Sequence, residues 1–84
     1  MKKKDIQKHI VDFLEEKKPI LKKYKKNISK YRYLDDGQID SLEIFSFIQK
    51  VEAFFKIKLK AIDTNSDKFR QVGGVVKIIA NKIK

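Results

Sequence analysis

The chain has 84 residues, 42% of them hydrophobic, which suffices for one compact domain and leaves little room for a second. It has no cysteine, which excludes disulfides, thiolate metal sites and thiol catalysis, and its single histidine, His9, cannot form a zinc site alone. The net charge is +10, and residues 1–32 contribute +8 of it, from twelve basic and four acidic residues. We therefore expect one domain over residues 1–84 with a small core and a basic amino-terminal part.

The amino-terminal segment predicts an amphipathic helix. Ile6, Ile10, Phe13 and Leu14 follow the spacing of one helical face, so the helix should run from about residue 4 to residue 17. Pro19 marks its end. The positively charged start is followed by no long apolar run, so we expect neither a signal peptide nor a membrane span, and we expect a cytoplasmic protein.

A long connection over residues 19–40 follows, with a Lys/Tyr-rich middle and a turn signal at residues 35–37. Loops of this length are often functional. At its end Asp40 is a good N-cap residue, and Glu43 three positions later completes an acidic variant of the capping box. The second helix should therefore begin at Ser41.

The second half of the chain predicts three more helical segments. We expect the second helix to bury one stripe of residues, Leu42, Phe45, Ile48, Val51 and Phe55, and residues 55–59 to be its exit. A short helix is expected near residues 63–68. The last helix, over about 71–83, should turn its aliphatic residues to the core, and Gly73-Gly74 would permit close packing. These elements predict an all-α fold, a small four-helix bundle with a long first loop and a short third helix.

An acidic segment stands out in this basic chain. Between residues 35 and 55 there are five Asp or Glu residues and only one basic residue, Lys50. A serine at the start of a helix is exposed and faces the positive end of the helix dipole, where free backbone N–H groups stabilise phosphate. Ser41 is therefore well placed to carry a phosphoryl-linked group, and the nearby carboxylates could bind Mg²⁺ during such a transfer or present a negative surface to a basic enzyme.

Around Ser41 the chain resembles the acyl carrier protein family, whose members bear 4′-phosphopantetheine on the serine of an Asp-Ser-Leu motif at the start of their second helix. The matching residues are Asp40, Ser41, Leu42, Phe45, Ile48, Val51, Phe55, Ile57 and Leu59. Downstream, residues 69–76 look like the family's Phe-x-Thr-Val segment, with Gln71 where threonine is usual. The resemblance covers nearly the whole chain.

This resemblance implies that Ser41 is the attachment site of a covalent 4′-phosphopantetheine, with no metal site and no catalytic residue in the chain itself. The arm would carry an acyl or aminoacyl group as a thioester. The implied partners are a phosphopantetheinyl transferase, a loading ligase and a receiving acyltransferase or synthase, and we expect a monomer. The expected recognition surface comprises Asp40, Leu42, Glu43, Ile44, Phe47 and Glu52.

The chain departs from the family in its charge. Two positions that are commonly acidic in the family are occupied here by Lys56 and Lys58. In addition, Gly37 precedes Ser41 by four residues, as in many specialised carriers, among them D-alanyl carrier proteins and stand-alone carriers. The partners are therefore expected to differ from those of ordinary fatty-acid synthesis.

An alternative comes from residues 22–26 and 30–33, where basic residues interleave with tyrosines as in some nucleic-acid-binding proteins. Because 19 of the 21 basic residues are lysine, this pattern indicates non-specific phosphate binding at most, and nucleic acid is not the expected partner. Contact of the basic part with an anionic membrane is a third hypothesis. A serine hydrolase is not expected, because the chain has no Gly-x-Ser-x-Gly motif.

Overall fold

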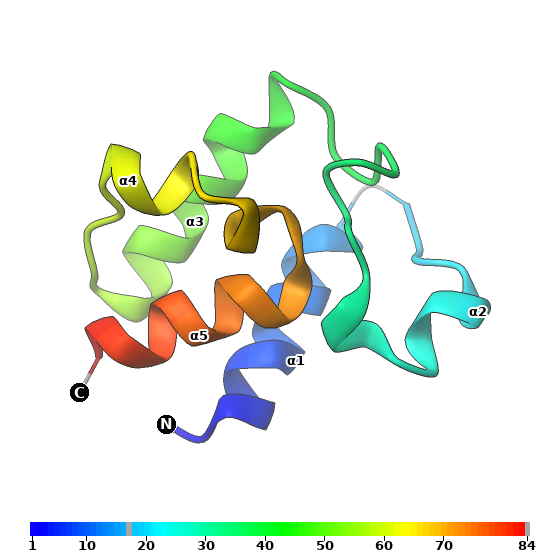
Figure 1. Ribbon diagram of the computed structural model, residues 1–84, viewed down its shortest axis with the longest axis horizontal. Helices are drawn as coiled ribbons and strands as arrows, with labels where there is room; N and C mark the ends of the chain where they lie inside the picture. Colours follow the sequence, from blue (N-terminus) through cyan, green and yellow to red (C-terminus); the bar gives the residue numbers. More distant parts are fainter. Residues whose placement is uncertain (17, 84) are drawn as a thin grey trace.

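The computed structural model describes residues 1–16 and 18–83, and within them the chain is all-helical, as predicted (Figure 1). Its α-helices are α1 (Lys3–Leu14), α2 (Lys22–Lys25), α3 (Glu43–Phe55), α4 (Ala61–Thr64) and α5 (Val72–Lys82). Two 3-10 helices, Ile28–Lys30 and Asp67–Arg70, complete the described structure. The short helix expected near residues 63–68 is instead divided between α4 and the second 3-10 helix. In the described part of the chain no helix is both long and apolar enough to cross a membrane.

The core lies where α1, α3 and α5 meet. Ile6, Ile10 and Leu14 of α1 are buried, as the spacing predicted, whereas Phe13 is only half-buried. Helix α5 adds an aliphatic face that was also predicted, of which four residues are buried and Ile83 is partly buried; the buried four are Val72, Val75, Val76 and Ile79. Hydrophobic burial of these two faces is the main force that holds the helices together.

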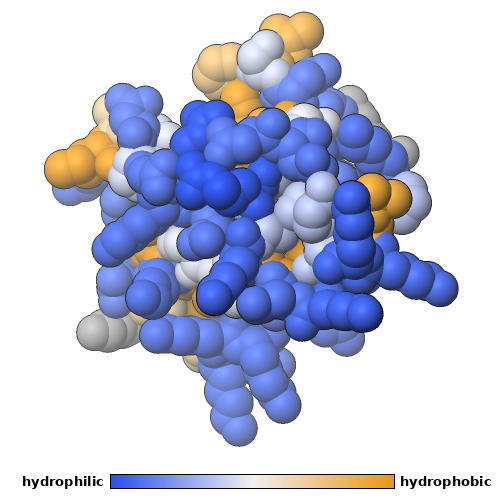
Figure 2. Space-filling view, turned by 45° about the vertical axis from the view of Figure 1, so that its right-hand side comes forward, coloured by the Kyte–Doolittle hydropathy of each residue, from blue (hydrophilic) through white to orange (hydrophobic). Residues whose placement is uncertain are grey.

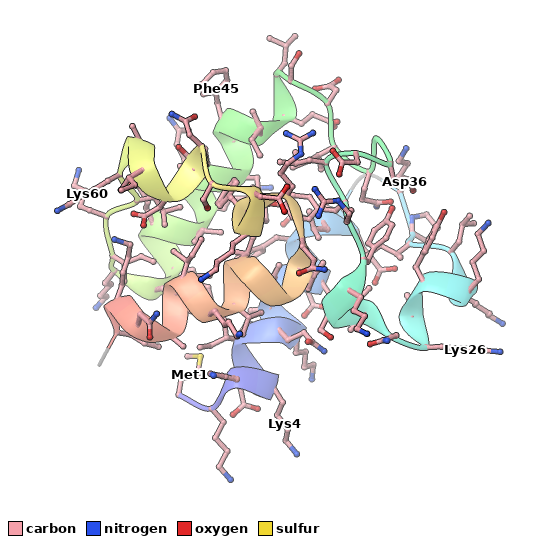
Figure 3. The ribbon with its side chains drawn as sticks, in the orientation of Figure 1. Met1, Lys4, Lys26, Asp36, Phe45 and Lys60 are labelled. Atoms are coloured by element: carbon pink, nitrogen blue, oxygen red, sulfur yellow. The ribbon has the colours of Figure 1, made fainter. Side chains whose placement is uncertain are left out.

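The predicted buried face of α3 is partly wrong. Leu42 and Phe45 are 79% and 66% exposed, and Figure 3 shows Phe45 pointing away from the other helices. In their place Phe47 is 4% exposed, and its ring lies 5.6 Å from Tyr33 and 6.2 Å from Phe69, measured between centroids. The physical reason is that α3 is apolar on more than one side, and the aromatic cluster with Tyr33 and Phe69 selects the face that carries Phe47.

The exit from α3 is as predicted. The helix ends at Phe55, and Lys56 takes a left-handed conformation with φ of 57°. The Glu52 carboxylate then accepts the backbone N–H of Leu59 at 2.8 Å. This contact fixes the segment that leads to α4.

The glycine pair at the start of α5 permits close packing, as predicted. A Cβ atom on Gly74 would lie 1.9 Å from the backbone oxygen of Lys68, and one on Gly73 would lie 2.7 Å from that of Ser29. Both distances are shorter than van der Waals contact. The start of α5 therefore needs glycine at both positions in order to lie against the two 3-10 helices.

The long loop is fixed to the segment that precedes α5. The backbone N–H of Val72 donates to the carbonyl of Tyr31 at 3.0 Å, and the buried hydroxyl of Tyr33 donates to the carbonyl of Phe69. Burial raises the pKa of Tyr33 above its usual range. On the surface, Arg32 pairs with Asp67. The loop that leads to α3 is thus held on the segment that leads to α5.

Gln38 holds the other side of this loop. Its buried side-chain amide donates to the carbonyl oxygens of Leu14 at 3.0 Å and of Lys18 at 2.7 Å. The Tyr31 hydroxyl donates to the Asp36 carboxylate at 2.6 Å on the same side. These polar contacts join the end of α1 to the turn just before Ser41, so the approach to α3 is well defined.

Candidate functional site at the start of helix α3

The turn from the loop into α3 is built by a reciprocal cap. The Asp40 carboxylate accepts the backbone N–H groups of Leu42 and Glu43 at 2.9 and 2.7 Å, and the Glu43 carboxylate accepts the N–H of Asp40 at 2.9 Å. The predicted capping box is therefore confirmed. Regular helix begins at Glu43, two residues later than predicted, because residues 41 and 42 form a turn.

Ser41 lies on this turn and is exposed. Within residues 1–16 and 18–83, its hydroxyl makes no hydrogen bond to another side chain or to the backbone. One part of the sequence argument is wrong, however: the first amides of the helix are not free for a phosphate, because Asp40 already occupies those of Leu42 and Glu43. The hydroxyl is accessible, but the cap beside it is negative.

A cavity of about 390 Å³ lies beside Ser41. Its lining residues are Leu34, Gly37, Ile39, Asp40, Ser41, Ile44 and Arg70. Arg70 reaches this cavity from the segment before α5 and donates to the Asp35 carboxylate, through Nε at 2.7 Å and through Nη2. The Arg70 and Arg32 guanidinium groups lower the pKa of Asp35. The site thus combines an exposed hydroxyl, apolar walls, the Asp40 carboxylate and a guanidinium group that is paired with Asp35.

No protein-family model, curated protein or solved structure matches this chain.

The residues expected to form a recognition surface do not all lie on the surface. Leu42 is exposed and Ile44 partly buried at the cavity wall. Phe47 is a correction, since it is a core residue and cannot contact a partner. Glu52 uses one carboxylate oxygen inside the fold, for the N–H of Leu59. The accessible surface around Ser41 is therefore smaller than expected.

The structure adds exposed apolar side chains that sequence reasoning missed. Phe45 on α3 was assigned to the core, and Ile62 on α4 was not considered, yet Ile62 is 79% exposed. Figure 2 shows hydrophilic side chains over most of one face, with hydrophobic groups at its upper, left and right margins. Only the unusual number of apolar residues on α3, more than one face can bury, could have indicated this from the sequence.

The tyrosine side chains of the Lys/Tyr-rich loop pack within the fold. Tyr31 and Tyr33 are 5% and 0% exposed, and the ring of Tyr24 stacks on that of Tyr31 with centroids 4.4 Å apart. Stacking of nucleic-acid bases would need exposed rings. The aromatic part of the nucleic-acid hypothesis is therefore not supported, and its lysines remain as a charged surface.

The described residues contain no candidate metal site. In the part of the chain that the structure describes, no three or more His, Asp or Glu side chains converge in a way that could hold a metal ion. Asp35 and Asp36 act as loop residues, since their carboxylates accept hydrogen bonds from Arg70 and from Tyr31.

Proposed function

We propose that this protein is an acyl carrier protein that bears 4′-phosphopantetheine on Ser41 and carries acyl or aminoacyl groups as thioesters. One observation carries the proposal: Ser41 is exposed, next to the capping Asp40 and beside a cavity, and its hydroxyl has no hydrogen bond within the described residues. A modifying enzyme needs such an accessible hydroxyl. The chain itself would not be an enzyme.

The arrangement of the helices supports the same proposal. Three longer helices, α1, α3 and α5, surround the core, and the short α4 comes between α3 and α5 along the chain (Figure 1). We propose that they make up the four-helix bundle of a carrier, with the loop before α3 as its long first loop. The chain would then act as a cytoplasmic monomer.

The residues around Ser41 fit a phosphodiester-linked arm. In the modification, the Ser41 oxygen forms a bond to phosphorus, the pyrophosphate bond of coenzyme A breaks, the adenosine bisphosphate leaves and the hydroxyl proton is released. Mg²⁺ would belong to the complex with the transferase. Arg70 has N–H groups beyond those that it gives to Asp35, and could pair with the phosphodiester. Its charge would offset the negative cap formed by Asp40.

The surface near Ser41 supports partners that recognise both charge and apolar contact. Leu42 and Phe45 are exposed beside the carboxylates of Asp40 and Glu43. We propose that this surface binds the phosphopantetheinyl transferase, the loading ligase and the receiving acyltransferase or synthase. A few buried anchor residues, often aromatic, contribute most of the energy at such interfaces.

The deciding experiment is the intact mass of the protein after incubation with coenzyme A, Mg²⁺ and a broad-specificity phosphopantetheinyl transferase. We expect a gain of one phosphopantetheine, its loss in Ser41→Ala, and its retention in Ser46→Ala, which removes another exposed hydroxyl from α3. Because Asp40 rather than Ser41 caps the helix, circular dichroism should show that Ser41→Ala remains folded. Absence of a mass gain with several transferases would reject the proposal.

A further inference from the structure

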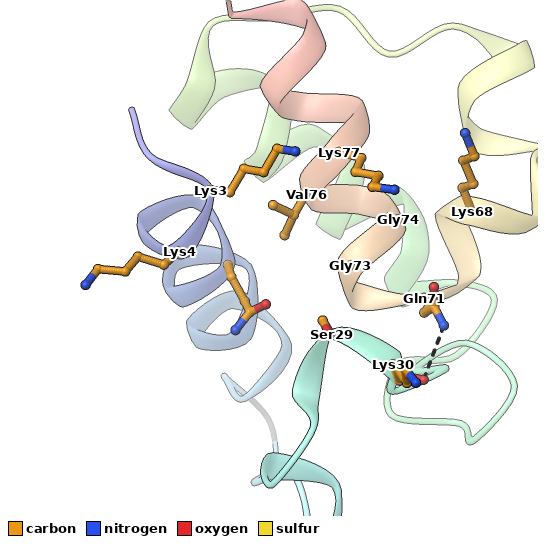
Figure 4. A pocket seen from close by; sticks show the side chains of 11 residues that line it. Lys3, Lys4, Ser29, Lys30, Lys68, Gln71, Gly73, Gly74, Val76 and Lys77 are labelled. Carbon is orange, nitrogen blue, oxygen red and sulfur yellow. Dashed lines mark hydrogen bonds between the residues drawn. The ribbon is translucent and has the colours of Figure 1, made fainter.

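A second cavity, of about 530 Å³, lies where α1, α5 and the 3-10 helix Ile28–Lys30 meet (Figure 4). We call it the basic cavity. Its lining residues are Lys3, Lys4, Gln7, Ser29, Lys30, Lys68, Gln71, Gly73, Gly74, Val76 and Lys77. It shares no lining residue with the cavity beside Ser41. The two cavities are therefore separate sites.

The charge of the basic cavity is one-sided. Five lysines line it and no carboxylate does. None of these lysines forms an ion pair within residues 1–16 and 18–83, although other lysines do, such as Lys25 with Glu15 and Lys82 with Asp63. Figure 4 shows Lys3 extending toward Val76 and Lys77, whereas Lys4 points away. Like charges on a concave surface repel one another, and a bound anion would relieve that repulsion.

Neutral hydrogen-bond donors line the same space. The Ser29 hydroxyl and the Gln71 amide contribute side chains; the Ser29 hydroxyl donates to Asn27 Oδ1 and Gln71 Nε2 donates to the carbonyl of Lys30, each over a long distance of 3.5 Å. Gly73 and Gly74 contribute backbone in the first turn of α5, where amide groups have no partner inside the helix. Gln71 makes no capping hydrogen bond to that turn. The cavity thus offers donors and positive charge, and no competing acceptor charge.

We propose that the basic cavity binds a small ligand with closely spaced phosphate groups, of the size of a nucleoside diphosphate or a phosphorylated lipid headgroup. Its volume lies within the range of small-molecule sites. The lysines supply charge for two or more phosphates, and Val76 contributes an apolar part of the wall. The site would operate independently of the Ser41 modification.

The test follows the amide signals of Gly73 and Gly74 by NMR during titration with inorganic pyrophosphate and with ADP. The cavity variant is Lys68→Gln with Lys77→Gln. The control is Lys22→Gln with Lys26→Gln, which removes the same charge from exposed lysines outside the cavity. A second arm uses phosphatidylcholine vesicles with or without a phosphorylated inositol lipid, which distinguishes a lipid headgroup from a free phosphate.

We expect saturable chemical-shift changes at both glycines. The affinity derived from them should fall about tenfold or more in the cavity variant and less than about twofold in the control. Binding in the vesicle arm alone, with the same dependence on the cavity lysines, would identify a lipid headgroup. Ser41→Ala should bind like the wild type, so this result is independent of the carrier proposal. No binding in either arm, or equal weakening in both lysine variants, would overturn the inference.

Discussion

The starts of α3 and α5 differ in how the first backbone N–H groups of the helix are bonded and in the charge around them. At α3 the first amides are bonded by the Asp40 carboxylate and the turn is negative. At α5 Gln71 provides no side-chain cap, and lysines surround the first turn. A free anion would be repelled at the first site and attracted at the second. A phosphoryl group at Ser41 would therefore be held by its covalent bond, whereas one near Gly73 would be held by charge.

The two helix starts are also mechanically connected. The loop that ends at Ser41 contacts the segment that begins α5 through Tyr33 and Phe69, through Tyr31 and Val72, and through Asp35 and Arg70; these are a buried hydrogen bond, a backbone hydrogen bond and an ion pair. A substitution that displaces one helix start should therefore also displace the other. The predictions below test the cap, the close packing and this connection separately.

The largest effect is expected at the start of α5. Gly74→Ala would place a Cβ atom 1.9 Å from the backbone oxygen of Lys68, which cannot move without displacing the second 3-10 helix. We expect the free energy of unfolding to fall by about 3 kcal/mol, measured by urea denaturation. Without a clash, alanine in a helix would instead stabilise by up to about 1 kcal/mol. An unchanged or higher stability would contradict the close packing.

Tyr33→Phe tests the connection between the two starts. It removes the donor to the buried Phe69 carbonyl, so we expect a loss of about 2 kcal/mol at neutral pH. Burial raises the pKa of Tyr33 in the folded protein, while an unfolded tyrosine ionises near pH 10. The stability of the wild type should therefore fall above about pH 10, because only the unfolded chain ionises readily there.

The variant should lose less stability in that alkaline range than the wild type. Some loss should remain, because burial and Asp36 also raise the pKa of Tyr31. Urea denaturation at a series of pH values measures both effects. Identical alkaline profiles for the two proteins would show that Tyr33 ionises as easily in the fold as outside it.

The capping carboxylate of α3 should contribute less than these buried contacts. Asp40→Ala removes the acceptor for two backbone N–H groups, and we expect a loss of about 1 kcal/mol. Asp40→Asn keeps an acceptor oxygen and should retain most of the stability. Both can be compared by thermal unfolding. Equal losses in the two variants would indicate that the charge, and not the hydrogen bonds, stabilises the turn.

The sequence predicted the features that depend on neighbours along the chain. The faces of α1 and α5 follow from helical spacing, and the Asp40 cap follows from the residue three positions later. The sequence-based prediction failed where the buried face of a helix depends on contacts with residues far along the chain. Phe47 is buried instead of Phe45 because Tyr33 and Phe69 pack against it.

The basic cavity shows the same limit. Lys3 and Lys30 are far from Lys68 and Lys77 in the sequence, and only the fold gathers them. Their lysine-rich surroundings gave no sign of which side chains would converge. The exposure of Ser41 and the Asp40 cap beside it, by contrast, could be predicted because both depend on contiguous residues, whereas the modification of Ser41 stays a prediction.

The smallest effect is expected at the surface ion pairs that join the two starts. Arg70 and Arg32 lower the pKa of Asp35, and Arg32 lowers that of Asp67. An unfolded aspartate titrates near pH 4, so these pairs stabilise the fold above about pH 4, and their contribution is lost as the pH falls through the lower folded pKa values.

Asp35→Asn should therefore flatten the acid side of a plot of unfolding free energy against pH. Asp12→Asn, which removes an exposed carboxylate with no ion pair in the described part of α1, should not. Added salt should reduce the difference between these variants, because all of the groups involved lie at the surface. If both variants keep the wild-type acid profile, the connection between the helix starts depends on the buried Tyr33 hydrogen bond and the backbone hydrogen bond of Val72. The ion pairs then contribute no measurable stability.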